Sequence, residues 1–354
     1  LMRANRRGSA GMAGFKVFTT AGESPGSYEY EMEALEPLGV QIIEAPADED
    51  KFIEAAKDAD ALYGRGTKIT KRIIDALPRC KLIALGSVGV DLVDVAAATA
   101  RGVAVTNCPD TFIEEVADHA MTLLLAAHRR VVEQDRMVRE GRWREGRPAL
   151  YQYPRLMGQT LGFIAFGHIP RAVATRARPF GLRMLAYDPF IEEVLMPPYG
   201  VLPATLDEVL EQSDFVSMHA PGTPEAAGML KEKHFRRMKK GAVFINTGRG
   251  STVEEAALIR ALQEGWIAHA ALDVLETEPP GHNNPLLSMT NVTLSAHVAS
   301  ASARFDPARK RRVGQELALA AQGKWPTSCV NPSVLAGSSL KRWQPVNMER
   351  GPNS

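Results

Sequence analysis

The sequence predicts an α/β protein with two doubly wound domains, each a parallel sheet covered by helices on both faces. Short apolar runs alternate with longer segments of helical period along most of the chain. Two long helical segments and a polar stretch that ends near Gly158 interrupt this alternation once, and it then resumes. The length of 354 residues is enough for two buried cores.

The first series of elements lies in the N-terminal third of the chain. Its apolar runs, which we expect to be buried strands, are residues 15–18, 40–43, 61–63, 82–85 and 103–105. Its helical segments are residues 28–38, 50–58, 69–77 and 91–101. Strands and helices that alternate in this way form parallel sheets. Asp91 begins the last of these segments and is expected to cap its helix.

Two long helical segments, residues 113–128 and 129–140, separate the two series. The strands of the second series are residues 161–166, 184–187, 215–219, 243–245, 270–272 and 292–294. A last helical segment, residues 306–323, is expected to return and pack on the first unit. We therefore expect one discontinuous domain, residues 1–106 plus 301–354, and a second domain, residues 107–300, inserted into it.

The composition excludes several classes of protein. The composition, 45% hydrophobic and 23% charged residues, is that of an ordinary globular protein. A net charge of +1 provides no excess of positive charge that would indicate binding to nucleic acid or to an anionic membrane. No apolar run approaches the ~20 residues of a membrane span. The three cysteines are widely scattered, which predicts a reducing, cytoplasmic location. No group of residues has metal-ligand spacing, so we expect no metal.

The two ends of the chain differ from the rest. Residues 1–11 contain three arginines and no acidic residue, which would suit a transit peptide. Because Leu1 is not an initiator and Met12 directly precedes the first strand, we favour an extension with the true start near Met12. Residues 336–354 are rich in Gly, Ser, Pro and Asn and are expected to be loose.

A candidate dinucleotide-binding turn follows the first strand of the second series. In the usual G-x-G-x-x-G turn, glycines let the backbone approach a pyrophosphate at a helix N-terminus. The aligned positions here are Ala165, Gly167 and Pro170, so the middle glycine alone remains. A proline in the first helical turn costs little. The N–H groups of His168 and Ile169 stay available for phosphate.

Asp188 follows the next strand, about 20 residues after Gly167, at the usual spacing for a carboxylate that binds the ribose hydroxyls. Such a carboxylate repels a 2′-phosphate, so the sequence favours NAD over NADP. The alternative is an ordinary turn between a strand and a helix, with Asp188 as a capping residue.

Arg249, Glu278 and His297 each follow closely on a predicted strand. An arginine binds a carboxylate in bidentate fashion, and a histidine moves protons near neutral pH. A carboxylate beside that histidine favours its proton-carrying form. This set suits a 2-oxo acid reductase. Taken singly, each has another reading: a salt bridge for Arg249, a turn cap for Glu278 and a satisfied core or surface group for His297.

Over residues 59–335 the chain resembles the D-isomer-specific 2-hydroxyacid dehydrogenases. Besides the turn at 162–170, the resemblance is carried by GSVGVD (86–91), VAVTN (103–107), VADH (116–119), YDP (187–189), VSMHAPGT (216–223), INTGRG (245–250), DV and EP (273–279) and SAH (295–297). It implies a Rossmann-type nucleotide domain, residues 107–300, inserted into a flavodoxin-like substrate domain. It also implies a homodimer that transfers a hydride between NAD(H) and a small D-2-hydroxy acid or 2-oxo acid, such as glyoxylate, hydroxypyruvate or a phosphoglycerate-like acid.

The same resemblance implies roles for individual residues. Arg249 would bind the substrate carboxylate, His297 would act as acid and base, and Glu278 would be the hydrogen-bonded partner of His297. The positions that match the nicotinamide surroundings are Thr247, Asp273, Ala220, Pro221 and Thr223. The positions that match substrate contacts are Val88, Gly89 and Arg65.

The sequence also departs from the family pattern. The outer glycines of the turn are lost, Asp118 replaces a more usual glutamate, and Ser-Ala-His replaces Thr-Pro-His. Residues 112–115, 129–130 and 175–190 are most similar to the branch that contains the C-terminal-binding-protein corepressors. The alternative function is therefore an NAD(H)-sensing interaction protein with a vestigial dehydrogenase site.

Two further assignments stay open. Residues 64–70 resemble the phosphoglycerate dehydrogenases, in which the arginine that matches Arg65 faces the substrate. A solvated surface arginine is an equally good reading of Arg65. The other histidines, of which His119 and His219 are two, have no comparable partners in the sequence pattern, although His219 ends a strand beside the cofactor loop.

Overall fold

The computed structural model describes residues 14–20 and 27–343. The hypothesis of an extension at residues 1–11 with a start near Met12 lies outside the described residues. The chain folds as two compact units. Unit 1 comprises Leu1–Thr111 and Ala303–Ser354, and unit 2 comprises Phe112–Ser302.

Unit 1 contains a sheet of five parallel strands in the spatial order β2-β1-β3-β4-β5. The strands are β1 (Lys16–Thr20), β2 (Gln41–Ala45), β3 (Ala61–Gly64), β4 (Leu82–Leu85) and β5 (Ala104–Thr106). The second strand of the chain lies on one side of β1 and the third on the other. This order is the flavodoxin-like form of the doubly wound fold, as the sequence predicts.

Helices cover both faces of this sheet because successive strand residues point to opposite sides. Phe18 and Ile83 pack with α2 (Glu49–Ala55), α3 (Lys71–Ala76) and α4 (Val95–Ala100). Val17 and Leu82 pack with α1 (Glu29–Leu35) and α12 (Phe305–Ala321) on the other face. A Cβ on Gly314 of α12 would lie 2.8 Å from Cα of Glu31 on α1, so glycine is what allows the two helices to approach.

Two expectations for unit 1 are wrong. The cap of α4 is Asp94, whose side chain accepts from the N–H of Ala97 at 2.8 Å, and not Asp91. Residues 336–343 are mostly exposed, but hydrogen bonds hold them in place, so they are not loose. Lys341 exchanges backbone hydrogen bonds with Gly323 (2.8 Å) and Trp325 (2.9 Å). The expectation for residues 344–354 lies outside the described residues.

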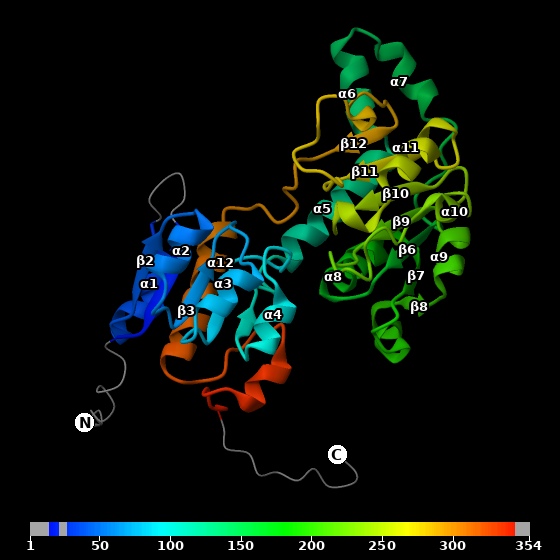
Figure 1. Cartoon of the computed structure of the whole chain (residues 1–354). Helices are drawn as coiled ribbons and strands as arrows, with labels where there is room; N and C mark the ends of the chain where they lie inside the picture. The colour runs from blue at the N-terminus through cyan, green and yellow to red at the C-terminus, as the bar shows by residue number, and fades with distance from the viewer. Residues whose placement is uncertain (1–13, 21–26, 344–354) are drawn as a thin grey trace, which may run out of the picture. The chain divides into compact units, whose positions relative to one another are not determined.

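Unit 2 contains a sheet of seven parallel strands in the spatial order β12-β11-β10-β9-β6-β7-β8 (Figure 1). The strands are β6 (Thr160–Ile164), β7 (Arg183–Tyr187), β8 (Val201–Pro203), β9 (Phe215–Met218), β10 (Val243–Asn246), β11 (His269–Leu272) and β12 (Val292–Leu294). The order reverses between β6 and β9. Doubly wound sheets bind ligands beyond the carboxyl ends of the strands at such a reversal. The Rossmann-type fold predicted for this segment is confirmed.

Helices also cover both faces of the second sheet. On one face, α5 (Ile113–His128) and α8 (His168–Ala177) pack on the apolar side chains of β6, β9 and β10. On the other face lie α9 (Leu206–Gln212), α10 (Glu232–Phe235) and α11 (Glu255–Gln263). After α5 come α6 (Val131–Arg139) and α7 (Trp143–Ala149). The sequence pattern predicts α6 but neither α7 nor the short strand β8.

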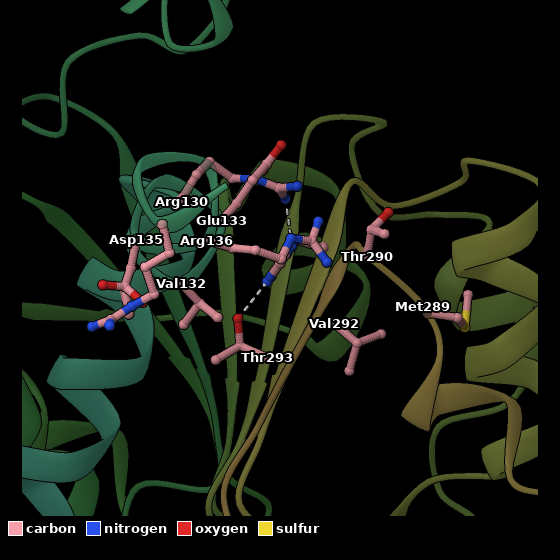
Figure 2. A pocket seen from close by; sticks show the side chains of 12 residues that line it. Arg130, Val132, Glu133, Asp135, Arg136, Met289, Thr290, Val292 and Thr293 are labelled. Atoms are coloured by element: carbon pink, nitrogen blue, oxygen red, sulfur yellow. Dashed lines mark hydrogen bonds and ion pairs between the residues drawn. The ribbon is translucent and has the colours of Figure 1, made fainter. Parts of the chain in front are cut away.

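The junction between α5 and α6 is held at the amino-terminal end of the sheet. Arg130 has a φ of 54° and donates to His269 Nδ1 at 2.6 Å and to Glu133 at 2.7 Å. His269 Nε2 lies 2.9 Å from the Thr293 hydroxyl. These groups line a cavity of about 290 Å³. Figure 2 labels Arg130, Glu133 and Thr293 among the side chains around it. Burial, and then the charge of Arg130, lower the pKa of His269 to about 3, so His269 is a neutral structural link.

Candidate active site

The three residues singled out in the sequence follow three neighbouring strands of unit 2. Arg249 follows β10, Glu278 follows β11 and His297 follows β12. Because the strands are parallel, their carboxyl ends meet at one edge of the sheet. The fold therefore brings the loops that carry the three side chains to the same edge.

His297 and Glu278 form a hydrogen-bonded pair. His297 Nδ1 lies 2.6 Å from Glu278 Oε2, and Glu278 Oε1 accepts from the N–H of Leu275 at 2.9 Å. The backbone hydrogen bond holds the carboxylate in place, and the carboxylate orients the imidazole. With Nδ1 committed to Glu278, Nε2 is the nitrogen that can exchange a proton with a ligand.

A network of short-range hydrogen bonds fixes the loop that carries Arg249. The Asn246 side chain accepts from the N–H of Gly248 at 2.9 Å, and its amide donates to the carbonyl of Arg249 at 3.1 Å. The Thr252 hydroxyl donates to the same carbonyl at 2.6 Å. A Cβ on Gly250 would overlap the carbonyl of Leu275, so glycine at this position lets the Arg249 loop pack against the segment that leads to Glu278.

Asp273 faces inward. Its carboxylate is buried and accepts from the Ser295 hydroxyl at 2.6 Å and from the N–H groups of Val298 and Ala299, each at 2.9 Å. Burial would raise the pKa of Asp273, but hydrogen bonds from His119, Ser295 and the two N–H groups outweigh it and hold the pKa well below its ordinary value. Asp273 is therefore an anionic anchor for the loop around His297.

The dinucleotide-type turn lies at the reversal point of the sheet, between β6 and α8. Gly167 precedes the first residue of α8 and has a φ of −73°, which any residue can adopt. A Cβ on Gly167 would meet no protein atom within 4 Å. Neither the backbone nor the packing requires this glycine, which therefore keeps space clear for a ligand.

The turn fits a dinucleotide in two other respects. No side chain caps the N-terminus of α8, so the N–H groups of His168 and Ile169 face a position suited to phosphate. The Thr247 hydroxyl, predicted to lie near the nicotinamide, is buried and has no hydrogen-bond partner among the described residues. A buried hydroxyl of this kind requires a partner from a ligand or water. Ala220, Pro221 and Thr223 follow β9 at the same edge of the sheet.

Asp188 braces this turn and caps the segment that follows β7. Its carboxylate accepts from the N–H of Phe166 at 2.8 Å and from the N–H groups of Phe190 (2.8 Å) and Ile191 (3.1 Å). The capping role considered for Asp188 is thus present. A carboxylate has about four lone-pair positions, so this role leaves acceptor capacity for ribose hydroxyls.

Ala165 occupies the position of the lost first glycine with a φ of 71°. Replacement by glycine removes the steric cost of a left-handed residue with a Cβ, about 1–2 kcal/mol, and so stabilises the folded protein. Glycine also raises the conformational entropy of the unfolded chain, which opposes this gain by about 0.4–1 kcal/mol. We therefore expect Ala165→Gly to raise the Tm by about 1–3 °C in scanning calorimetry. Ala165→Val, which adds a β-branched side chain at the same φ, is expected to lower the Tm. A lower Tm for the glycine variant would contradict the strain argument.

The residues expected to contact substrate in unit 1 lie in two loops. Arg65 follows β3, donates to the Tyr28 hydroxyl at 3.0 Å and lies over the rings of Tyr28 and Tyr63. It is therefore held against aromatic side chains and is not a freely solvated surface arginine. Val88 and Gly89 follow β4, and their carbonyls accept from Asn107 and Ser87, each at 2.7 Å.

Two histidines have partners that the sequence pattern did not indicate. His119 of α5 lies 2.9 Å from the Ser295 hydroxyl and 3.4 Å from Asp273, so the expectation that it lacks comparable partners is wrong. His219 lies 2.8 Å from the Ser217 hydroxyl. Burial lowers the pKa of His219 to about 3, which keeps it neutral and suits a structural role. No sequence spacing signals the His119 contact, because it joins residues 176 positions apart.

Residues 14–20 and 27–343 contain neither a membrane-spanning helix nor a metal-binding cluster. No helix in these ranges has the length and apolar character needed to cross a membrane. The same residues contain no group of three His, Cys, Asp or Glu side chains placed to hold a metal ion.

A Rossmann-type sheet with these residues at its carboxyl edge is typical of oxidoreductases that bind a nicotinamide dinucleotide at the reversal point. The chain belongs to the D-isomer specific 2-hydroxyacid dehydrogenase family. The model of that family's NAD-binding domain matches residues 121–299, which lie within unit 2.

Named relatives support this assignment. The chain is 43% identical over 294 residues to a glyoxylate reductase of Korarchaeum cryptofilum, covering 82% of this chain and 89% of the relative. An NADPH-dependent glyoxylate/hydroxypyruvate reductase from Sinorhizobium meliloti, solved with NADP and malonate, has a TM-score of 0.77 at 34% identity, covering 90% and 97%. D-Lactate dehydrogenase from Aquifex aeolicus, solved with NAD and lactic acid, has a TM-score of 0.73 at 26% identity, covering 91% and 98%.

Proposed function

We propose that this protein transfers a hydride reversibly between NAD(H) and a small 2-oxo acid or D-2-hydroxy acid, with glyoxylate and hydroxypyruvate as the first candidates. The observation that carries the proposal is the 2.6 Å contact between His297 and Glu278 at the edge of the sheet shared with the Arg249 loop. Unit 2 binds the dinucleotide, and the residues predicted to contact substrate, Arg65, Val88 and Gly89, belong to unit 1. These roles correspond to the domains expected at residues 107–300 and at residues 1–106 plus 301–354.

The three side chains divide the work of reduction. Arg249 binds the substrate carboxylate through its guanidinium and polarises the neighbouring ketone. His297 gives the proton on Nε2 to the carbonyl oxygen, and in the reverse direction it takes the hydroxyl proton. Glu278 accepts a hydrogen bond from the Nδ1–H group of His297 and stabilises the charged imidazole. The bound nicotinamide supplies or accepts the hydride.

The dinucleotide is held by residues at the carboxyl ends of the strands. Gly167 leaves room for the pyrophosphate, His168 and Ile169 donate backbone N–H groups to it, and Asp188 accepts from the ribose. The residues around the nicotinamide are Ala220, Pro221, Thr223 and Thr247. Asp273 contributes there through the loop that it anchors.

The cofactor preference is expected to depend on the charge of Asp188. Asp188→Asn removes the negative charge that would repel a 2′-phosphate and keeps one acceptor for the turn. We expect the ratio of the Kd of NADPH to that of NADH to fall by about tenfold, as judged from a charge repulsion of 1–2 kcal/mol near a surface. Fluorescence titration with both nucleotides measures this. A wild-type preference for NADPH would contradict the assignment.

The proposed function is tested by following NADH absorbance with a panel of 2-oxo acids: glyoxylate, hydroxypyruvate, pyruvate, and branched and aromatic acids. Consumption of NADH with any of them supports the proposal. Tight NADH binding without turnover across the panel would support the corepressor-like alternative. The arginine, glutamate and histidine at one sheet edge favour the enzyme, since a pure sensor of NAD(H) does not need an acid–base pair.

We also propose that the protein is a cytoplasmic homodimer. Its three cysteines are free thiols, as suits a reducing compartment. Helices α6 and α7 and the turn after α7 expose large apolar side chains: Val131, Val132, Val138, Trp143 and Tyr151. Such a patch on a monomer marks an interaction surface.

Trp143 is the most exposed member of this patch, at 75%. We expect Trp143→Glu to shift the molar mass measured by light scattering from that of a dimer toward that of a monomer, because a buried charge at an interface is costly. The exposed Trp343 of unit 1 offers a matched control, and Trp343→Glu should leave the mass unchanged. A wild-type monomer would exclude the homodimer.

A further inference from the structure

His119 lies on α5, outside the catalytic set, yet it contacts the loop that carries His297. Its Nε2 atom is 2.9 Å from the Ser295 hydroxyl oxygen and 3.4 Å from Asp273 Oδ1. The Ser295 hydroxyl has one hydrogen, which it donates to Asp273 at 2.6 Å. The hydroxyl oxygen must therefore accept from His119, so Nε2 of His119 carries a hydrogen.

The Asp273 carboxylate also binds residues that come before and after His297 in the chain. Ser295 precedes His297 and donates to Asp273, while the N–H groups of Val298 and Ala299 follow it and donate to the two oxygens of Asp273. The N–H of His297 itself donates to the Asp273 carbonyl at 2.8 Å. His297 has a φ of 51°, a conformation that residues other than glycine adopt when surrounding contacts impose it.

His119 links this anchored loop to the body of unit 2. Its helix, α5, packs on the sheet, whereas Ser295 and His297 lie in the exposed loop after β12. The His119 side chain is 22% exposed and the Asp273 side chain is fully buried, so the contact is mostly shielded from water. A hydrogen bond that is shielded from water is stronger than an exposed one.

We propose that His119 is a positioning residue for the acid–base histidine: through Ser295 and Asp273 it sets the direction of the His297 imidazole. This inference rests on the proposed function of His297. Acid–base catalysis depends on the alignment of the proton with the reacting atom. Loss of the His119 donor therefore lowers turnover without removing a group that touches substrate or cofactor.

The test compares two substitutions at His119. Leucine removes the donor, whereas the amide nitrogen of glutamine replaces Nε2. We expect His119→Leu to lower kcat about tenfold, the cost of roughly one hydrogen bond, with the KM for NADH unchanged. His119→Gln should recover most of the lost turnover. His128→Leu is the matched control, because His128 is buried on the same helix and contacts Phe215 rather than the loop.

A second readout needs no turnover. The hydrogen on Nδ1 of His297, bound to Glu278, gives a downfield proton resonance in the ligand-free protein, which is assigned by its loss in His297→Asn. We expect this resonance to shift or broaden in His119→Leu and to stay in His119→Gln and His128→Leu.

Equal kcat and equal spectra for the leucine and glutamine variants would overturn the positioning role, as would an equal kcat loss in His128→Leu. Failure of the proposed function is a different result. In that case the wild-type protein would show no turnover with any 2-oxo acid, and the resonance would still report whether His119 positions His297.

Discussion

Replacement of His297 by asparagine is expected to lower kcat for 2-oxo acid reduction by about 10²–10⁴-fold, the usual contribution of a positioned general acid. Asparagine tolerates a left-handed backbone better than most residues, and His297 has a φ of 51°. The variant thus removes the proton donor with little backbone strain. The Kd for NADH should stay the same, because His297 would act on the substrate oxygen.

His297→Ala should show the same fall in kcat together with a lower Tm, since alanine is strained at this φ. The comparison separates the chemical role from the structural one. Glu278→Gln is a graded control: it keeps the acceptor for the His297 hydrogen and removes the charge, so kcat should fall less than in His297→Asn. Turnover that is unchanged in His297→Asn would refute the mechanism.

Replacement of Arg249 by alanine is expected to lower kcat/KM for the 2-oxo acid by about 10²–10⁴-fold. This corresponds to the loss of two charge-assisted hydrogen bonds of about 1.5–3 kcal/mol each. Arg249→Lys keeps the charge but not the two parallel donors, so it should recover only part of the loss. Steady-state kinetics with glyoxylate and hydroxypyruvate measure both effects, and the Kd for NADH should change little.

Arg260 provides the matched control for this prediction. It lies on α11 in the same unit and pairs with Glu232 at the surface. Arg260→Ala removes an arginine that is more exposed than Arg249 and lies away from the strand ends. An Arg249→Ala variant that keeps both kcat and KM would show that Arg249 serves the structure of its loop and not the substrate.

The predictable parts of the fold are those with a local signal. Apolar runs such as residues 82–85 and 243–245 indicate buried parallel strands, and apolar residues that recur with helical periodicity over residues 113–128 indicate α5. Strand β8 is short and ends in proline, and α7 contains Gly146 and Pro148, so neither has a strong local pattern. The choice between Asp91 and Asp94 as a cap depends on where the first helical turn begins, which two nearby aspartates leave open.

The candidate site likewise has parts that the sequence predicts and parts that it does not. Residue type and position after a strand indicated Arg249, Glu278 and His297, and the structure gives a direct contact between the last two. The direction of the Asp273 side chain was not predictable. Its partners, Ser295 and His119, come from the loop after β12 and from α5. A pattern along one strand carries no information on which of them reaches the carboxylate.

Patterns along the chain are enough to predict the two doubly wound sheets and the residues that follow their strands, because strand and helix periods are local and parallel strands bring their carboxyl ends to one edge. What those residues touch depends on tertiary packing. It turned Asp273 inward, brought His119 to Ser295 across 176 positions of the chain, and placed Ala165 in a left-handed turn braced by Asp188. Such contacts follow from the packing of helices on the sheet, which fixes distances that no spacing in the sequence encodes.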